Sequence, residues 1–324
     1  MKMKKIGVLC SGGDAPGMNA ALRAVVRRGI AKKLKIIAIY RGFDGIFQEY
    51  FEEMTARSVG DIVQRGGTII KTARCEKFFI DEGVREAAEI LKKHNFDGLC
   101  ALGGDGTFKG LLALQKHWNG QLIGIPTTID NDVYGTDYTV GFDTAIDTAI
   151  QALDKIRDTA ESHERIFIVE VMGRESGYIA LEVGIGAGAE EILIPEEAPV
   201  DFAALANRLR SARERGKKSI IIVVAEGADE RDIFTFSKEL MKYLDVKTYL
   251  SILGHVQRGG APSALDRWLA TRLGAFSVDC FLNGDTGIMV GEQNHQLVKV
   301  PLIETQKKKP IEKYAFSLIQ DLAI

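Results

Sequence analysis

Short apolar runs of strand length alternate with amphipathic segments along nearly the whole chain, and this alternation limits the fold more than any other feature. The runs lie at Ile6–Cys10, Ile36–Tyr40, Gly98–Leu102, Leu122–Ile125, Ile166–Val171, Ile192–Ile194, Ile220–Val224, Leu250–Leu253 and Gly287–Val290. Between many of them apolar residues repeat at i, i+3, i+4 and i+7, as in Val84, Ala87, Ala88 and Leu91. Continuously apolar strands between amphipathic helices predict doubly wound α/β structure, with parallel sheets covered on both faces.

The number of these units exceeds one ordinary sheet, so we expect two three-layer α/β lobes. The segments 144–157 and 264–281 have the same helical pattern. No low-complexity linker separates the lobes. The charged stretch Asp154–Arg165 is the best candidate in the pattern for a crossing between them.

Charge and cysteine content exclude several classes of protein. Of 324 residues, 42 are Lys or Arg and 44 are Asp or Glu, so nothing global predicts a nucleic-acid partner or an anionic membrane. The four cysteines are scattered, which argues against a zinc site and fits a reducing compartment. The start, MKMKKIGVLC, has too short an apolar run for a signal sequence or a spanning helix, so we expect a cytoplasmic protein.

Part of the surplus of glycine, 34 residues in all, clusters just after the apolar runs. They lie in Ser11–Asp14, in Gly103–Thr107, at Gly173 and Gly177, and at Gly254 with Gly259 and Gly260. The carboxyl ends of strands face the ligand crevice in this class of fold, and glycine lets backbone N–H groups approach a ligand closely. Several such loops favour a phosphorylated ligand, although any one of them could simply be a tight turn.

Two carboxylates follow the run Leu122–Ile125 directly. Asp130 and Asp132 are candidates for a general base toward an alcohol, and Asp105 in the neighbouring glycine loop is a candidate Mg²⁺ ligand. The alternative is that these residues cap helices. Arg74, Arg165, Arg174 and Arg258 lie beside strands or loops and suit phosphate binding, although each alone could be a solvated surface arginine. His255 and Glu226 also follow strand ends and could bind substrate hydroxyls.

Two common nucleotide-binding motifs are not found in the expected context. The best match to G-x-G-x-x-G/A, Gly184–Ala189, follows a helical pattern instead of a strand, which disfavours a nicotinamide dehydrogenase. No G-x-x-x-x-G-K-[ST] is present, so the chain is not a P-loop enzyme. Phosphoryl transfer needs positioning and charge stabilisation, and the glycine, aspartate and arginine set can supply both.

Five blocks together resemble the bacterial 6-phosphofructokinases. They are Ser11–Asn19, Gly103–Gly106, Pro126–Asp132, Val171–Arg174 and Leu253–Gly260. The resemblance runs from residue 5 to about 300, with the blocks in family order. It implies a homotetramer of two-lobed chains with interleaved connectivity: a larger ATP- and Mg²⁺-binding lobe of residues 1–140 plus 256–304, and a smaller sugar-phosphate lobe of residues 141–255 plus 305–324.

The resemblance also implies the activity, in which ATP phosphorylates the 1-hydroxyl of fructose 6-phosphate. Asp130 takes the base position, Asp105 the Mg²⁺ position, and Thr128 and Asp132 flank the reacting groups. The matched ATP positions are Gly13, Arg74, Cys75, Gly104, Asp105, Gly106 and Thr107, with Arg74 also stabilising the transferring phosphoryl group. The matched substrate positions are Thr128, Ile129, Asp130, Met172, Gly173, Arg174 (also catalytic), Glu226, His255, Val256, Gln257, Arg258 and, from a neighbouring subunit, Arg165.

Two departures from the family pattern bear on the substrates. Pyrophosphate-using relatives carry Asp where this chain has Gly106 and Lys where it has Thr127, so ATP is favoured, although Thr127 also replaces the glycine usual in bacterial ATP enzymes. Tyr249 stands where the family usually has an arginine that reaches the sugar 6-phosphate. We expect Lys247 to supply the missing charge; the alternatives are weaker 6-phosphate binding or another phosphorylated sugar.

The effector site of the family, which binds ADP or phosphoenolpyruvate, is mostly matched, so the resemblance implies allosteric regulation. Its positions here are Arg23, Arg27, Arg57, Arg157, Gly188, Glu190, Arg215 and Lys217, where Arg57 is shifted by one because Ala56 occupies the expected place. A pyrophosphate-dependent enzyme, a kinase for another ketose phosphate and a non-catalytic nucleotide-sensing paralogue remain alternatives. The last is disfavoured because every carboxylate that the chemistry needs is present.

Overall fold

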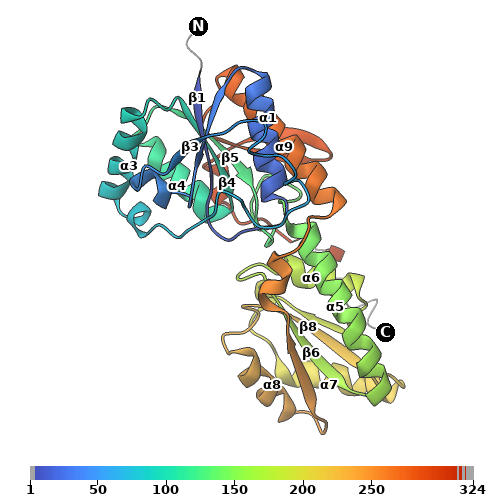
Figure 1. Ribbon diagram of the computed structural model, residues 1–324. Coiled ribbons are helices and arrows are strands. Elements are labelled where there is room, and N and C mark those ends of the chain that lie inside the picture. The colour runs from blue at the N-terminus through green and yellow to red at the C-terminus, as the bar shows by residue number, and fades with distance from the viewer. Residues whose placement is uncertain (1–3, 312–313, 316–317, 319–324) are drawn as a thin grey trace. The chain divides into compact units, whose positions relative to one another are not determined.

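The structure is a computed structural model that describes residues 4–311, 314–315 and 318. The chain forms two compact units, coloured by sequence in Figure 1. The first unit contains Met1–Thr144 and Arg258–Lys309, and the second contains Ala145–Gln257 and the residues from Pro310 on, as far as either is described. The expected boundaries at 140 and 255 lie close to these. The return expected at 305 comes only after Lys309, and residues 319–324 of that expectation lie outside the described residues.

A sheet that has seven strands in the described residues forms the centre of the first unit, in the order β11-β10-β5-β4-β1-β2-β3. Its strands are β1 (Lys5–Cys10), β2 (Lys35–Ile39), β3 (Phe51–Glu53), β4 (Gly98–Gly103), β5 (Gln121–Pro126), β10 (Ile288–Gln293) and β11 (Gln296–Pro301). The inner strands are parallel, as predicted, and the edge strands β3 and β11 are antiparallel to their neighbours. The sequence pattern does not predict these two edge strands, because neither is a continuous apolar run.

Helices cover both faces of this sheet (Figure 1). On one face α1 (Met18–Ala31) and α9 (Ala264–Asn283) lie side by side, so closely that a Cβ at Gly274 would lie 2.6 Å from the Ala21 carbonyl oxygen. On the other face α3 (Asp81–Lys93) and α4 (Asp105–Gln115) cover a core that includes Leu99 and the fully buried Phe108. Burial of each such side chain stabilises the fold by roughly 1.5–3 kcal/mol. Short helices are α2 (Asp44–Phe47), η1 (Glu76–Phe79) and η4 (Glu304–Gln306).

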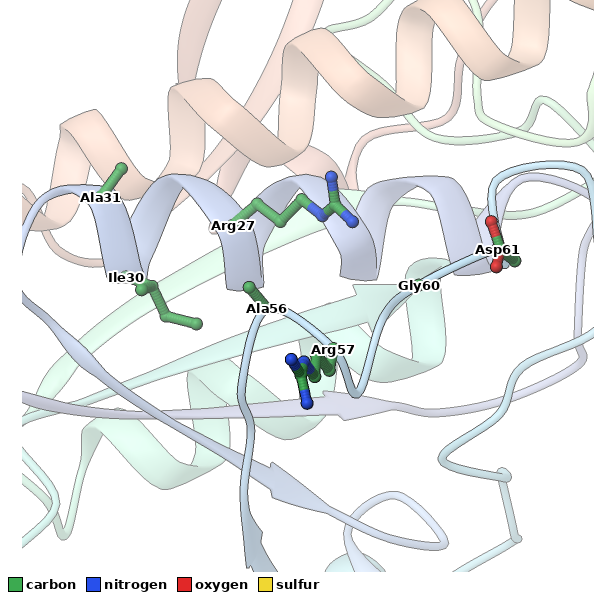
Figure 2. Close-up of a pocket in the computed structure, with 7 residues that line it drawn as sticks. All are labelled: Arg27, Ile30, Ala31, Ala56, Arg57, Gly60 and Asp61. Atoms are coloured by element: carbon green, nitrogen blue, oxygen red, sulfur yellow. The ribbon is translucent and has the colours of Figure 1, made fainter.

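A pocket of about 670 Å³ lies between α1 and the turn that follows β3. Figure 2 shows Arg27 and Ile30 on the helix side and Arg57 and Asp61 on the turn side. Two arginines therefore line a hollow on the first unit, which bears on the effector positions considered below.

The second unit is built on a parallel sheet with the order β7-β8-β6-β9. Its strands are β6 (Ile166–Val171), β7 (Glu191–Leu193), β8 (Ile220–Ala225) and β9 (Thr248–Ile252), and its helices are α5 (Phe142–His163, which begins in the first unit), α6 (Tyr178–Gly186), α7 (Phe202–Glu214) and α8 (Ile233–Met241). Short 3-10 helices are η2 (Pro195–Glu197) and η3 (Gly254–Arg258). The predicted doubly wound α/β class is confirmed for both units.

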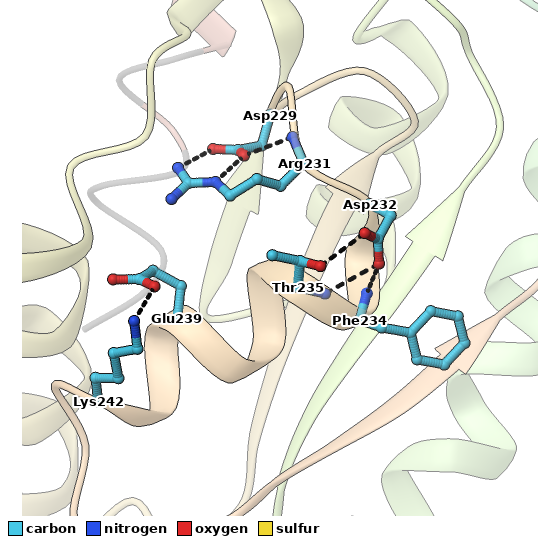
Figure 3. A network of polar contacts seen from close by, with 7 residues as sticks. All are labelled: Asp229, Arg231, Asp232, Phe234, Thr235, Glu239 and Lys242. Atoms are coloured by element: carbon cyan, nitrogen blue, oxygen red, sulfur yellow. Dashed lines mark hydrogen bonds and ion pairs between the residues drawn. The ribbon is translucent and has the colours of Figure 1, made fainter.

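Helix α8 begins at a side-chain cap, drawn in Figure 3. One carboxylate oxygen of Asp232 accepts hydrogen bonds from the amides of Phe234 and Thr235, both at 3.0 Å, and the other accepts one from the Thr235 hydroxyl at 2.7 Å. The bonds from Thr235 lower the pKa of Asp232. A cap of this kind stabilises a helix by about 1 kcal/mol and fixes where α8 starts after β8.

The crossing expected within Asp154–Arg165 is wrong. Most of this stretch is the last part of α5, and the first crossing lies instead between Thr144 and Ala145. The charges recur with helical spacing on a single long helix, so they form its solvated face and no linker. Among the described residues, no helix combines the length and the apolar character that crossing a membrane requires.

Candidate active site

The first unit has a topological switch point between β1 and β4. From β1 the chain continues to β2 on one side, and from β4 it continues to β5 on the other. Hydrogen bonds join the loops that leave these strands: Ser11 N–H donates to the Leu102 carbonyl at 2.9 Å, and Thr127 N–H donates to the Gly103 carbonyl at 2.9 Å. Ligands of open α/β sheets bind at such a point, outside the carboxyl ends of the strands.

The glycines of the β4–α4 loop differ in what a side chain would meet. A Cβ at Gly103 would clash with the Thr107 hydroxyl, and one at Gly104 would lie 3.3 Å from the Thr128 Cβ. A Cβ at Gly106 would have no atom of the described chain within 4 Å. Packing therefore explains Gly103 and Gly104, whereas Gly106 leaves open space beside the first turn of α4, where free N–H groups favour an anion.

Gly13 lies against Arg258. A Cβ at Gly13 would clash with the Arg258 guanidinium, which donates a hydrogen bond to the Asp14 carbonyl at 3.2 Å. Arg258, matched to a sugar-phosphate position, thus lies at the β1 loop that is matched to ATP. The small size of Gly13 admits this arginine, a reason that the sequence alone does not provide.

The segment that carries Arg74 and Cys75 also reaches the β1 loop. The Thr72 hydroxyl donates to the Gly12 carbonyl at 2.8 Å. Arg74 is exposed, whereas Cys75 is half-buried against the core beneath α3 and α4. Burial raises the pKa of the Cys75 thiol, which keeps it protonated at neutral pH. The structure therefore ties this segment to the β1 loop through Thr72 and to the core through Cys75.

Asp105 is the first residue of α4. Its carboxylate pairs with Lys109 one turn later, at 2.5 Å. Within residues 4–311, 314–315 and 318, no group of three or more His, Cys, Asp or Glu side chains could hold a metal by itself. Mg²⁺ in nucleotide sites commonly takes one or two carboxylates together with phosphate oxygens, so a single aspartate at a helix N-terminus, where phosphate can bind, fits this ion.

Asp130 lies in the loop that follows β5 and is 6% exposed. Its N–H donates to the Thr128 hydroxyl at 3.2 Å, and Ile129 between them is fully buried. Asp132, two residues on, is exposed. The turn between the two aspartates is made by Asn131, which has φ +49° and is 2% exposed. One loop thus carries two aspartates in different environments: Asp130 is buried and Asp132 is exposed to solvent.

In the second unit the predicted sugar-binding loops also share one edge. Glu226 N–H donates to the Val171 carbonyl at 2.8 Å, which joins the loop after β8 to the Met172–Arg174 loop after β6. Gly173 has φ +149°, and a Cβ there would clash with the Ser176 carbonyl. Arg174 follows with φ +53° and an exposed side chain. Glycine is therefore required at Gly173 for this tight loop.

The loop after β9 joins the same edge. Leu253 N–H donates to the Glu170 carbonyl of β6 at 3.0 Å. His255 and Val256 are exposed, whereas Gln257 is fully buried and donates to the Gly254 carbonyl at 3.0 Å. Burial, and then the charges of Glu226 and Asp232, raise the pKa of Glu170, so this edge of the sheet carries carboxylates that repel one another.

Arg165 and Lys247 lie at the opposite end of the same sheet. They immediately precede β6 and β9, whose first residues are paired. Six strand residues at about 3.3 Å each separate Arg165 from the Arg174 loop, so within one chain these two arginines occupy opposite ends of β6. β9 begins at Thr248, so strand alternation does not by itself place the exposed Lys247 beside Tyr249.

The predicted effector residues form one group in each unit. Arg27 and Arg57 line the pocket of Figure 2, and Arg23 lies one turn before Arg27 on α1. In the second unit the Arg157 guanidinium donates to the carbonyls of Ala187 and Gly188, both at 2.7 Å.

The second-unit group is completed around Glu190, which is 6% exposed. It accepts hydrogen bonds from Lys217 at 3.2 Å and from Ile221 N–H at 2.7 Å, and it lies 3.8 Å from Arg157. Arg215 is exposed at the end of α7. The structure therefore gathers Arg157, Gly188, Glu190 and Lys217, with Arg215 nearby in sequence.

Several residues at the site carry no signal of their own in the sequence. Lys109 pairs with Asp105, and Thr72 holds the Arg74 segment. Phe43 and Phe78 stack with ring centroids 4.1 Å apart and lie against Gly110, one turn after Gly106. Gly106 and Gly110 are spaced i, i+4 on α4, and this spacing could have predicted a helix face without side chains.

The fold and the two sets of strand-end loops define a class: an α/β protein whose topological switch point combines glycine loops with a carboxylate loop. A family model described as phosphofructokinase matches residues 5–281. The chain belongs to the phosphofructokinase family.

Full-length relatives agree with this assignment. A protein of Thermus thermophilus, named ATP-dependent 6-phosphofructokinase 1, is 50% identical over 323 residues, which is 99% of this chain and all of the relative. The solved phosphofructokinase of Saccharomyces cerevisiae is 34% identical with a TM-score of 0.85, over 99% of this chain and 47% of that one. A pyrophosphate-dependent phosphofructokinase of Marinobacter aquaeolei shares the fold at 23% identity, with a TM-score of 0.83 over 99% of this chain and 92% of that one.

Proposed function

We propose that this chain is an ATP-dependent 6-phosphofructokinase. The γ-phosphoryl group of ATP passes to O1 of fructose 6-phosphate: a new P–O1 bond forms, the bond to the β,γ-bridging oxygen breaks, and ADP leaves. The observation that carries the proposal is the meeting of the α4 N-terminus, with Asp105 and the open side of Gly106, and the Asp130 loop at the carboxyl edge of one sheet.

The nucleotide binds along this edge. Gly104, Gly106 and Thr107 receive its phosphates at the first turn of α4, and Gly13, Arg74 and Cys75 complete the site. The open space at Gly106 supports ATP as donor, because an aspartate side chain would fill the place of the α-phosphate. Thr127, whose hydroxyl is buried without a partner among the described residues, brings no cation that could replace a nucleotide.

Asp105 would hold Mg²⁺ together with phosphate oxygens, and the ion would supply positive charge to the transferring group. The Lys109 ammonium, which pairs with Asp105, must then give up this partner or share it. Arg74 is free to turn toward the transferring phosphoryl group, because its side chain is exposed.

Asp130 acts as the general base that accepts the proton of the sugar 1-hydroxyl. Thr128 positions it through the hydrogen bond from the Asp130 amide, and Asp132 flanks the reacting groups. Phosphoryl transfer depends mainly on such positioning and on charge stabilisation, so the rigid loop matters as much as the carboxylate itself.

The sugar phosphate is bound by Met172, Gly173, Arg174, Glu226 and the loop His255–Arg258. Arg165, Tyr249 and Lys247 act from a neighbouring copy in a homotetramer. The position of Arg165 at the amino end of β6, away from Arg174, supports this arrangement, since one chain does not offer both arginines at one end of the sheet.

ADP or phosphoenolpyruvate regulates the enzyme at the effector residues, and the pocket at Arg27 and Arg57 supports a phosphate-bearing effector. Rate curves in fructose 6-phosphate should be sigmoidal and should shift with ADP or phosphoenolpyruvate; hyperbolic curves that neither compound changes would remove this part of the proposal. The expected place of action is the cytoplasm.

Asp130→Asn tests the catalytic assignment. Loss of a general base should lower kcat by about 10²- to 10⁴-fold with little change in KM. Equilibrium binding of ATP provides the control, because the variant should bind ATP as the wild type does. Near-normal turnover in a folded variant would refute the assignment of Asp130.

A further inference from the structure

The loop that carries Asp130 is held in shape by the side chain of Asn131. The Asn131 Oδ1 accepts the Thr139 N–H at 3.0 Å, and its Nδ2 donates to the Asp137 carbonyl at 3.2 Å. The Thr139 hydroxyl donates to the Thr128 carbonyl at 2.6 Å, which closes the loop on itself. Asn131 has a left-handed backbone conformation, which asparagine adopts more readily than most residues because its side chain hydrogen-bonds locally, as it does here.

A segment distant in sequence lies against this loop. Residues 302–309, which we call the returning segment, follow β11 and end where the first unit ends. Lys308 forms an antiparallel backbone bridge with Val133, and the Lys307 ammonium lies 5.5 Å from the centre of the Tyr134 ring. The returning segment therefore runs beside the residues that immediately follow Asp130 and Asn131.

Lys309 connects the returning segment to the anchors of the loop. Its ammonium donates to the Asn131 Oδ1 at 2.9 Å and to the Asp137 carbonyl at 2.7 Å. It thus binds both the acceptor that fixes Thr139 and the carbonyl that fixes the Asn131 amide. Hydrogen bonds from a charged donor are roughly twice as strong as neutral ones, and the Asn131 end of this network is almost fully buried.

We propose that Lys309 is a positioning residue for the general base: it fixes the conformation of Asn131 and thereby the direction in which Asp130 presents its carboxylate. The inference rests on the proposed function of Asp130. Without the ammonium, the Asn131 side chain loses one partner and the Asp137 carbonyl another, and the loop gains freedom next to the reacting group. Small displacements of a catalytic group can lower a rate by about 10²-fold.

The chain crosses between the two units directly after Lys309. Lys309 is the last residue of the first unit, and Pro310 is the first of the second. On the second-unit side the Tyr178 hydroxyl donates to the Pro310 carbonyl at 2.7 Å. Both residues of this crossing are thus anchored, one of them to the loop of the proposed base.

Lys309→Ala tests the proposal, with Lys308→Ala as matched control, because Lys308 is exposed and pairs with Val133 through its backbone. In the full-length protein, Lys309→Ala should lower kcat about tenfold or more while the dissociation constant for ATP changes less than about twofold. Lys309→Arg should recover most of kcat, since it keeps a charged donor. Amide hydrogen exchange in residues 131–139 should rise in Lys309→Ala alone.

Equal kcat values in Lys309→Ala and Lys308→Ala would overturn the proposal, and so would a loss of kcat without faster exchange in the loop. The exchange measurement also separates this inference from the proposed function. If the wild-type protein does not phosphorylate fructose 6-phosphate, the proposed function fails, while unchanged exchange in Lys309→Ala would refute the positioning role by itself.

Discussion

The guanidinium carbon of Arg165 lies 4.3 Å from the centre of the Tyr249 ring. Tyr249 is paired with Phe167 across β6 and β9, and their ring centroids are 5.5 Å apart. Tyr249, at the position where the family resemblance implies an arginine, is therefore a neighbour of Arg165. We expect Tyr249 to hold Arg165 in place, since a cation over an aromatic face is attracted by about 0.5–2 kcal/mol.

Replacing Tyr249 by Leu should raise KM for fructose 6-phosphate about fivefold and leave kcat nearly unchanged, because the stack is worth about 1 kcal/mol. Tyr249→Phe keeps the ring and should behave like the wild type. If Tyr249→Phe is as impaired as Tyr249→Leu, the hydroxyl rather than the stack is responsible. Steady-state kinetics of both variants decide between these roles.

A variant of Lys247 tests whether this lysine supplies the charge of the arginine that the resemblance implies at position 249. Lys247→Ala should raise KM for fructose 6-phosphate about tenfold or more, since a charge-assisted hydrogen bond contributes about 1.5–3 kcal/mol. Lys238→Ala removes another exposed lysine of the same unit and serves as the control. An unchanged KM in Lys247→Ala would show that Arg165 and Tyr249 act without it.

Gly106→Ala should separate stability from function. No atom of the described chain lies within 4 Å of the added Cβ, and alanine is favoured over glycine in a helix by about 1 kcal/mol, so the melting temperature should stay equal or rise. The methyl group should instead crowd the nucleotide, and KM for ATP should rise about tenfold. An unchanged KM for ATP, with the fold intact, would show that the phosphates of ATP do not bind at Gly106.

Asp266 should make stability depend on pH. It is 1% exposed and accepts bonds from Gly141 N–H at 2.7 Å and Thr144 N–H at 2.9 Å, and burial raises its pKa from 3.8 to about 6. The folded state thus favours the protonated form, so this contribution to stability is fully present below pH 3.8 and is lost as the pH rises through 6. The variant Asp266→Asn serves as the reference, because asparagine does not titrate.

Between pH 7 and pH 5 the free energy of unfolding of the wild type should therefore increase, relative to that of Asp266→Asn, by about 1 kcal/mol. Denaturant unfolding of both proteins at the two pH values measures this difference. A difference that stays constant, or that falls toward pH 5, would contradict the raised pKa of Asp266.

The apolar runs predict most strands correctly because both faces of the inner strands are buried. They do not predict β3 and β11, whose burial is partial and whose backbones are placed by pairing with β2 and β10. The charged end of α5 resembles a crossing in sequence for a related reason: charge indicates contact with solvent, and both a linker and an exposed helix face are in contact with solvent. Local sequence does not distinguish the two.

At the site, the glycine loops and the two aspartates are predictable because each follows a strand. Gly13 must be small because a Cβ there would clash with Arg258, which is distant in sequence. Asn131 is anchored by Lys309, which lies 178 positions away. Such pairs depend on which segments the fold brings together, which no local spacing encodes. The stacking of Arg165 on Tyr249 is a third case, since only the register of β6 and β9 makes them neighbours.

The proposed activity is tested most directly by the rate of fructose 1,6-bisphosphate formation by the purified protein with Mg²⁺ and each of two phosphoryl donors, ATP and pyrophosphate. Related ketose phosphates in place of fructose 6-phosphate complete the panel. We expect rapid formation with ATP, little or none with pyrophosphate, and a clear preference for fructose 6-phosphate. Turnover with pyrophosphate that equals or exceeds turnover with ATP, or no phosphorylation of fructose 6-phosphate by either donor, would contradict it.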